Sequence, residues 1–205
     1  MALVSGTKWL FAKTLRDMLR ENTLRQIKVI DLCKACGADR QTFYYHFRDK
    51  YDLVAWIYEQ TFQEVLRGSG GVFRLEEMEK LLLAFQEDRF FYKKVFDDHS
   101  QNSLMSYIQE VNVNYTRKGL LKEQKTDSLS QEIEFSMRFF SHAWIGCMKD
   151  WIAEDHGIDA KQYAKLLYDN TSALVLRNPI TIYHEKEVHP HESLNLHRIR
   201  KIRPY

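Results

Sequence analysis

Apolar residues follow a helical spacing along nearly the whole chain. They recur three and four positions apart in each long segment up to about residue 177, which puts them on one face of an α-helix. All three prolines, Pro179, Pro190 and Pro204, lie beyond that point, so none interrupts the earlier helices. The pattern predicts an all-α fold, with helices over residues 7–21, 29–36, 40–45, 50–66, 75–85, 104–115, 128–156 and 159–177. A polar loop is expected over residues 117–127.

Polar residues and glycines mark the expected ends of these helices. Thr7 and Asp159 are placed as N-caps, and Ser128 with Gln131 has the spacing of a capping box. Three of the eight glycines fall within residues 68–71, which predicts a boundary between two domains there.

Two short helices around a tight turn stand out in residues 27–53. Four apolar residues share one face of the first helix: Val29, Leu32, Cys33 and Cys36. Gly37 supplies the left-handed backbone that ends such a helix, and Asp39 is placed to cap the next one. Asp49 is placed in the same way before a helix that begins at Lys50. This arrangement is typical of a helix-turn-helix DNA-binding unit.

The second of these helices would present polar side chains outward. Phe43 and Phe47 share a face and are expected to be buried, which leaves the other side chains free to reach DNA. Arginine suits guanine, glutamine suits adenine, threonine suits the thymine methyl group, and tyrosine hydroxyls suit phosphate oxygens. The expected base-reading residues are Arg40, Gln41 and Thr42, and the expected phosphate contacts are Lys28, Tyr44, Tyr45, His46 and Lys50.

Charge is distributed unevenly along the chain. The formal net charge is only +2, but residues 1–50 carry ten Lys and Arg against five Asp and Glu. A basic N-terminal end on a slightly acidic remainder fits a DNA-binding head joined to a domain with another task. No apolar run approaches the length of a membrane span, and the first ten residues lack the features of a signal peptide. We therefore expect a cytoplasmic protein with no membrane partner.

A longer motif covers the same region. Thr42-Phe43-Tyr44-Tyr45-His46-Phe47, followed by Lys50 and Leu53, matches the pattern T-[LF]-Y-x-[HY]-F and K-x-x-L. At these residues the chain resembles the TetR family of bacterial transcriptional regulators. The segment RQTFYYHFRDKYDLVAWI is especially similar to the branch that includes regulators of dihydroxyacetone kinase operons, and the similarity continues at FQEDRFFYKKVF and FFSHAWIGCMKDWI. The resemblance covers roughly residues 7–176.

The resemblance implies a particular architecture and mode of action. Residues 1–66 would form an N-terminal three-helix helix-turn-helix DNA-binding domain with its connecting helix, and residues 72–178 a C-terminal helical effector-binding and dimerisation domain. The implied function is a ligand-responsive regulator, a repressor rather than an activator, that binds a pseudo-palindromic operator in double-stranded DNA as a homodimer. A ligand that favours a wrongly spaced pair of heads would release the DNA.

The resemblance also suggests two sets of residues in the second domain. In TetR-like proteins the last two helices meet their copies in a four-helix interface, here expected to include Met137, Phe140, Trp144, Met148, Trp151, Tyr163, Leu167 and Leu174. The unknown small-molecule effector is expected near aromatic and histidine side chains, the candidates being Phe96, His99, Tyr107, Phe139, His142 and Trp144. Aromatic residues at helical spacing are also the usual content of a helical core.

Two residues depart from the family pattern. Lys28 stands where many members have a capping Ser or Thr, and Asp39 stands where many have Ser. Lys28 cannot accept a capping hydrogen bond, and the charge of Asp39 would lie close to DNA. The alternative function is therefore a TetR-like coactivator or ligand sensor that acts through a protein partner and has little independent DNA binding.

Other chemistry has weaker support in the sequence. Cys33 and Cys36 form a C-x-x-C, but a structural zinc site needs four ligands and Cys147 is the only other cysteine. We expect both to be core residues, and no metal to bind. No nucleophile and base are spaced for catalysis, so neither an enzyme nor a cofactor is expected. The tail, residues 179–205, holds four histidines and a basic cluster; DNA or partner contact and weak metal binding are possible roles, and a flexible extension is favoured.

Overall fold

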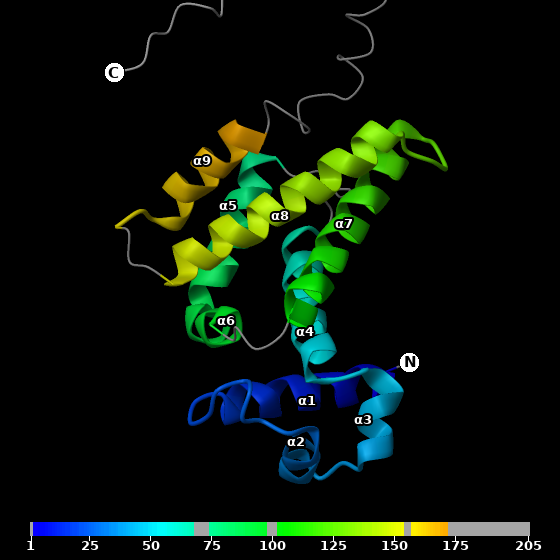
Figure 1. The fold of residues 1–205 in the computed structure, drawn as a ribbon, viewed down its shortest axis with the longest axis vertical. Helices are drawn as coiled ribbons and strands as arrows, with labels where there is room; N and C mark the ends of the chain where they lie inside the picture. Colours follow the sequence, from blue (N-terminus) through cyan, green and yellow to red (C-terminus); the bar gives the residue numbers. More distant parts are fainter. Residues whose placement is uncertain (1, 68–73, 98–101, 154–156, 172–205) are drawn as a thin grey trace, which may run out of the picture.

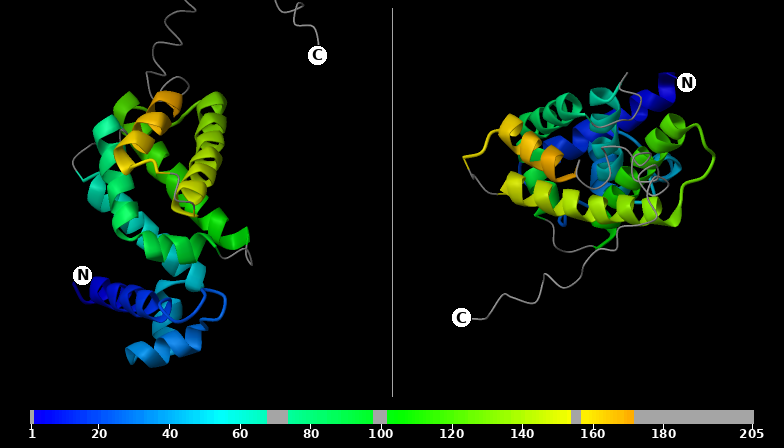
Figure 2. Two further views of the ribbon diagram at one scale, coloured as in Figure 1. Left: turned by 90° about the vertical axis from the view of Figure 1, so that its left-hand side faces the viewer. Right: turned by 90° about the horizontal axis from the view of Figure 1, so that it is seen from above.

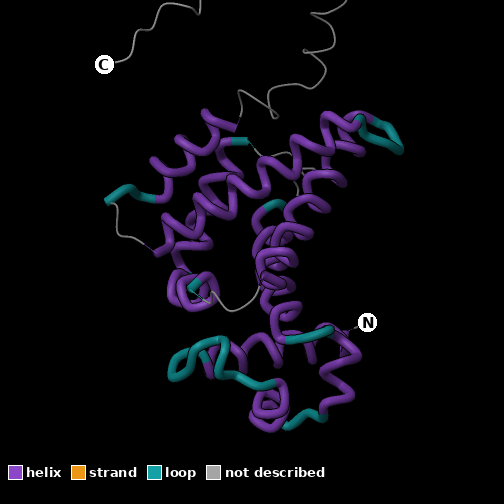
Figure 3. Tube along the Cα trace, in the orientation of Figure 1, coloured by secondary structure: helices purple, strands orange, loops and turns teal. Residues whose placement is uncertain are grey.

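Nine α-helices and no β-strand make up the part of the chain that the structure describes. The computed structural model describes residues 2–67, 74–97, 102–153 and 157–171. The helices are α1 (Ala2–Met18), α2 (Val29–Cys36), α3 (Arg40–His46), α4 (Lys50–Val65), α5 (Leu75–Glu87), α6 (Arg89–Phe96), α7 (Asn102–Gln124), α8 (Gln131–Ala153) and α9 (Ala160–Thr171). Short loops and turns join them where the connections are described (Figure 3). The expected all-α fold is confirmed.

Helices α1, α2 and α3 and the start of α4 form a small unit, here called the head, at one end of the molecule (Figure 1). Its core is aromatic. The Phe43 ring of α3 lies edge-on to Phe11 of α1, with ring centroids 5.2 Å apart, and Phe47 lies 5.6 Å from Phe43. Leu15 and Leu32 are fully buried beside them. Because burial of each such side chain stabilises by about 1.5–3 kcal/mol, α3 is held firmly against α1.

Local backbone chemistry explains where the helices of the head begin and end. α2 ends at Gly37, whose φ of 69° lies in the left-handed region that glycine adopts without strain. Asp39 caps α3 by accepting the backbone N–H of Thr42 at 2.6 Å. Asp49 caps α4 by accepting two backbone N–H groups of its first turn at 2.8 and 2.9 Å. These three boundaries are confirmed as the sequence predicts them.

Helix α4 leaves the head and enters a larger unit, here called the body, which contains α5 to α9 (Figure 1). α4 packs along α7, α7 packs along α8, and α9 packs mainly along α5 rather than along α8. The two further views agree that α8 lies on the outer surface of the body (Figure 2). Aromatic side chains from four helices fill the interior, with ring centroids 4.5–6.5 Å apart: Tyr58, Phe62, Phe85, Tyr92 and Trp144.

A buried polar group crosses this aromatic interior. The Tyr58 hydroxyl of α4 donates to Asn112 Oδ1 of α7 at 2.9 Å and accepts the indole N–H of Trp144 of α8 at 2.8 Å. The Asn112 amide in turn donates to Ser141 Oγ at 3.5 Å. Burial raises the pKa of Tyr58 far above its usual range, so the hydroxyl keeps its proton. Side chains of α4, α7 and α8 are therefore joined by hydrogen bonds as well as by packing.

Two expected helix limits near the N-terminus and at α8 are wrong. α1 begins before Thr7, so Thr7 lies within the helix instead of capping it, and the helix ends at Met18. α8 begins at Gln131, and Ser130, not Ser128, accepts a backbone N–H of its first turn, at 3.4 Å. Residue type alone suggested both caps. In the structure the turn before Thr7 is already helical, and Ser130 caps α8 in place of Ser128.

The expected polar loop over residues 117–127 is also wrong over most of its length. α7 continues to Gln124, beyond the stripe of apolar residues that predicted it. Leu120 is buried, and the Arg117 guanidinium binds the Glu134 carboxylate of α8, with Nε 2.9 Å from Oε1. Arg117 here faces α8 as an ion-pair partner, so its charge does not indicate a loop.

Some expectations lie outside the described residues. They include the glycine boundary at residues 68–71 and the tail at 179–205, so the domain limits stay a prediction. α9 is described to Thr171, short of the expected end near residue 177. None of the helices in the described ranges has the length and apolar character needed to cross a membrane.

Candidate nucleic-acid interface

Helix α3 turns a row of polar and aromatic side chains away from the core of the head. Arg40 and Gln41 are exposed, Tyr44 is 48% exposed and Tyr45 is 77% exposed. The Arg40 guanidinium lies 5.7 Å from the centre of the Tyr44 ring, close enough for a cation–π contact that orders both side chains. Thr42 is half-buried. The structure therefore brings the five expected DNA-contacting residues that precede His46 on α3 to one short helix.

The start of α3 carries a negative charge. Hydrogen bonds from Thr42 lower the pKa of the exposed Asp39 carboxyl below its usual range, so the group is ionised at neutral pH. The charge stabilises the N-terminus of the helix. It would also repel a phosphate that approached this end of α3.

The two expected lysine contacts differ in their surroundings. Lys28 precedes α2, is exposed, and forms no side-chain capping bond, as its chemistry requires. The Lys50 ammonium donates to the backbone carbonyls of Leu24, Arg25 and Ile27 at 2.7, 3.0 and 2.8 Å. Lys50 thus ties the loop between α1 and α2 to the start of α4. Its contact with a phosphate stays a prediction, and an ammonium group has only three N–H donors to share.

His46 ends α3 and faces the inside of the molecule more than the other expected phosphate contacts. It is half-buried, and desolvation, with a smaller effect of the nearby Lys8 ammonium, lowers its pKa below 6.5. The imidazole is therefore neutral at pH 7, and a phosphate would meet it as a hydrogen-bond donor without a full charge.

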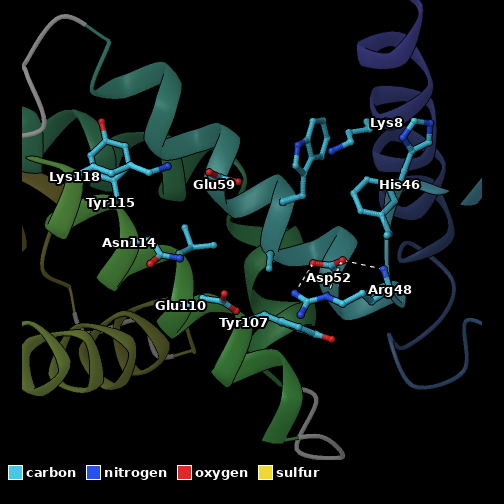
Figure 4. A pocket seen from close by; sticks show the side chains of 14 residues that line it. Lys8, His46, Arg48, Asp52, Glu59, Tyr107, Glu110, Asn114, Tyr115 and Lys118 are labelled. Carbon is cyan, nitrogen blue, oxygen red and sulfur yellow. Dashed lines mark hydrogen bonds and ion pairs between the residues drawn. The ribbon is translucent and has the colours of Figure 1, made fainter. Parts of the chain in front are cut away.

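A polar groove separates the head from α7 of the body (Figure 4). Its cavity volume is about 300 Å³. Lys8, His46 and Arg48 line it from the head, and Glu110 and Lys118 line it from α7. Arg48 binds Asp52 in the first turn of α4 through its backbone N–H and its guanidinium, at 2.9 and 3.2 Å, and both residues line the groove.

The residues expected around an effector do not lie together. Tyr107 lines the groove, whereas Phe96 is buried against Tyr92, and Trp144 belongs to the interior of the body, where its indole is bonded to Tyr58. His99 lies outside the described residues. An effector site therefore stays a prediction, and the structure shows different environments for its expected members.

The outer face of α8 carries the two other expected effector residues. Phe139 is 55% exposed and Phe135 is 71% exposed, with their rings stacked at a centroid distance of 6.5 Å. His142 is exposed and its Nε2 lies 2.7 Å from the Gln109 amide nitrogen of α7. Ala143 and Gly146 continue the same exposed stripe, which is partly apolar.

The residues expected at a dimer interface lie mostly on the opposite face of α8. Four of them are buried within the chain: Met137, Met148, Trp151 and Leu167. Three are half-buried in contacts within the body: Phe140, Trp144 and Tyr163. Leu174 lies outside the described residues. In the structure α8 uses this face to pack against the rest of the body, and the role of these residues in a dimer stays a prediction.

The cysteine pair behaves as a core element. Cys33 is buried, Cys36 is half-buried against the same core, and desolvation raises the pKa of both thiols. Thiols with a raised pKa are poor metal ligands and poor nucleophiles. Among the described residues no three His, Cys, Asp or Glu side chains are grouped to hold a metal ion.

The sequence pattern assigned no role to Arg48, Asp52 or Lys118, all of which line the groove. The sequence could have pointed to Arg48, since it lies between the end of α3 and the cap of α4. The sequence could not have pointed to Lys118, because its position depends on how α7 lies against the head.

Comparison with known proteins supports the same interpretation of the fold. Residues 75–172 match the family described as "Transcriptional regulator C-terminal region", which is of the TetR type. The "HTH-type dhaKLM operon transcriptional activator DhaS" of Lactococcus lactis subsp. lactis (strain IL1403) is 32% identical over 91 residues, 44% of this chain. The chain spans about half of that relative, since the match covers 49% of its length.

A solved structure extends the similarity to the head. The "Dihydroxyacetone kinase operon activator DhaS" aligns with a TM-score of 0.54 at 24% identity, over 82% of this chain and 96% of that chain. At this identity the likeness shows the fold. The chain thus has the fold of this solved regulator, and its residues 75–172 are similar to the C-terminal region of TetR-type transcriptional regulators.

Proposed function

We propose that this protein is a DNA-binding transcriptional regulator that reads a pseudo-palindromic operator as a homodimer. The observation that carries the proposal is the exposed row on α3, which starts with Arg40 and Gln41 and continues with Tyr44 and Tyr45. Helix α3 is capped at its start and packed through Phe43, so it presents these side chains from a rigid support. A short rigid helix with Arg and Gln at its first turn suits the edges of bases in a major groove.

The distribution of charge supports the same function. The head carries the excess of Lys and Arg that the first 50 residues show, and phosphate attraction supplies most of the affinity of such a head. Asp39 is the exception, and it is compensated in part by Arg40 directly beside it. Binding should therefore be salt-dependent and moderate for one head, which favours two heads acting together.

The exposed stripe of α8 supports a homodimer. Phe135 and Phe139 form an apolar pair, followed along the helix by the small residues Ala143 and Gly146. Small residues allow another helix to approach closely, and exposed aromatic pairs favour burial. We assign this stripe, and not the inward face of α8, as the contact between copies.

The base-reading assignment has a direct test. Replacing both Arg40 and Gln41 by Ala is expected to weaken binding to DNA from upstream of the protein's own gene by about 1–3 kcal/mol for each base-reading side chain removed. Fluorescence anisotropy at several salt concentrations measures this effect. Arg20→Ala is the control, because it removes one exposed head cation whose ion pair is with Asp17 of α1, away from α3. Equal losses of affinity in the two variants would mean that charge alone is read.

The alternative function makes a different prediction in the same experiment. Asp39 is ionised and exposed at the start of α3, which is the observation that favours a coactivator or sensor with a protein partner. In that case the wild-type protein alone would not bind the DNA at moderate salt. Restoration of binding by a partner from the same operon would support the alternative, and specific binding by the protein alone would exclude it.

The direction of regulation is a separate proposal. The two relatives are named as activators, which favours activation here over the repression that the resemblance alone suggested. A promoter fused to a reporter gene should then lose expression when this protein is deleted, and regain it when the protein is supplied. A small-molecule effector remains part of the proposal, and the reporter in the presence of candidate metabolites would reveal one. A rise in expression on deletion would instead show a repressor.

A further inference from the structure

One side chain of the body reaches the segment that directly follows the DNA-reading helix. The Tyr107 hydroxyl of α7 donates to Asp49 Oδ2 at 3.1 Å. The other oxygen of Asp49 accepts the N–H groups that open α4. Asp49 thus uses one oxygen to start α4 and the other to hold α7. Desolvation and the carboxylate of Asp49 raise the pKa of Tyr107, so the hydroxyl stays protonated and remains a donor at neutral pH.

A second contact joins Tyr107 to the same segment. The Arg48 guanidinium lies 4.4 Å from the centre of the Tyr107 ring, within the range of a cation–π interaction. Arg48 is itself fixed by Asp52 through its backbone N–H and its guanidinium. Tyr107, Arg48 and Asp49 are here called the latch. Figure 4 shows Tyr107 extending from α7 toward Arg48 and Asp52.

The latch has a counterpart on the other side of the head. The Arg16 guanidinium of α1 binds Asp88 Oδ2 between α5 and α6 at 2.9 and 3.1 Å and lies 4.6 Å from the Phe91 ring centre. These two attachments help to hold the orientation of the head on the body, together with helix α4, whose Trp56 ring packs against Trp9 and Phe47 of the head. If one attachment is broken, fewer contacts oppose a turn of the head about the others.

The space beside the latch allows such a turn. The groove lined by Tyr107, Lys8 and Glu110 has a cavity volume of about 300 Å³ and is polar, so a packed apolar core does not hold the head against α7 at this point. Lys118 and Glu110 are exposed on its α7 wall. The head's orientation therefore depends here on a few polar contacts rather than on burial.

We propose that Tyr107 is a positioning residue that sets the orientation of the DNA-reading helix relative to the body, and so the distance between half-sites that a dimer accepts. This proposal rests on the proposed function. The latch attaches at Arg48 and Asp49, two and three residues after α3 ends at His46, so a shift at the latch moves α3 directly. A dimer fixes the two bodies, and each latch then fixes one head.

Tyr107→Phe tests the latch with a minimal change. It removes the hydroxyl and its bond to Asp49 while keeping the ring beneath Arg48. Operators with half-site spacings changed by one base pair in either direction are compared with the best spacing by anisotropy. We expect wild type to prefer one spacing, and Tyr107→Phe to lose roughly tenfold in affinity at that spacing and much less at the others, within the usual range of coupling between sites. An unchanged spacing preference would overturn the proposal.

Tyr92→Phe is the matched control. It also removes one hydrogen bond of a tyrosine, the one between Tyr92 and Thr61 within the body. It should lower thermal stability at least as much as Tyr107→Phe, because Tyr92 is fully buried and Tyr107 is half-buried. Its spacing preference should match wild type. If both variants lose affinity equally at all spacings, the effect is one of stability and the positioning role is excluded.

A measurement without DNA separates this proposal from the proposed function. The three native cysteines are replaced by Ala, and new cysteines are placed at the exposed residues Lys34 of α2 and Gln86 of α5. Spin labels are attached to these two cysteines, and the labelled chains are diluted in unlabelled protein. Pulsed electron resonance should give one narrow distance distribution for the otherwise native sequence and for Tyr92→Phe, and a broader one for Tyr107→Phe. Equal widths would refute the latch even if DNA binds. Absence of DNA binding by wild type would refute the proposed function, and the distance result would still decide the latch.

Discussion

Phe139→Glu is expected to convert a dimeric protein to a monomer and to lower its affinity for a two-half-site operator by at least about 100-fold. The side chain is more than half exposed and its neighbours on the stripe are Phe135, His142 and Ala143, so the folded chain accepts the change. In an interface the added carboxylate would be buried opposite its own copy, and burial of such unpaired like charges costs several kcal/mol. Sedimentation equilibrium and operator anisotropy measure the two effects.

Leu83→Glu is the control for this prediction. Leu83 of α5 is also an exposed apolar residue, 40% exposed, and it lies off the α8 stripe. It should leave both the mass in solution and the operator affinity unchanged, while circular dichroism shows that both variants keep their helices. A Phe139→Glu protein that remains dimeric would place the interface elsewhere, and a wild-type monomer at micromolar concentration would contradict the homodimer itself.

The face of α8 shows what the sequence alone could not decide. The helix has apolar residues on two sides, with Met137 and Met148 on one and Phe135 and Phe139 on the other. Helical spacing identifies both stripes but does not say which one packs against α6 and α7. Only the path of the chain in space assigns the first to the interior, and so the second to the surface.

The helix limits of the head could be predicted from the sequence, because the contacts that set them are local. Gly37, Asp39 and Asp49 act on backbone groups within four residues of themselves, and these contacts are local in sequence. Lys50 shows the limit of prediction from local contacts, because its ammonium binds carbonyls 23 to 26 residues earlier in the chain. The sequence places Lys50 at the start of a helix and so near DNA, but it does not reveal that three carbonyls surround its amine.

The groove and the latch could not be predicted from the sequence, because their residues are far apart along the chain. Tyr107 and Asp49 are 58 residues apart, and Asp49 was identified only as a cap. Trp144 shows the reverse case: its aromatic character suggested a ligand or a partner chain, but its indole N–H has a partner in the Tyr58 hydroxyl of α4. An aromatic residue with a polar atom needs its hydrogen-bond partner identified before a function is assigned to it.

The second large predicted effect is on stability, and it comes from removing the Tyr58 hydroxyl. Tyr58→Phe is expected to destabilise the protein by about 2–4 kcal/mol, because it leaves the buried Asn112 Oδ1 and the Trp144 N–H without the bonds they now make. The ring itself is retained, so packing against Phe62 and Phe85 changes little. Urea unfolding followed by circular dichroism measures the decrease in stability. Tyr45→Phe is the control, since its hydroxyl lies on a side chain that is 77% exposed, and it should cost almost nothing.

The double variant Tyr58→Phe with Asn112→Leu distinguishes unsatisfied polar groups from reduced packing. If the cost of Tyr58→Phe comes from the orphaned Asn112 oxygen, removing that oxygen as well should make the double variant less destabilised than the sum of the two single changes, by about 1 kcal/mol or more. Additive losses of stability would mean that the hydroxyl and the amide stabilise the body independently. Because Tyr58 lies on α4, which also begins at the latch, a loosened Tyr58 contact should weaken the hold of α4 on α7 and α8 from the body side.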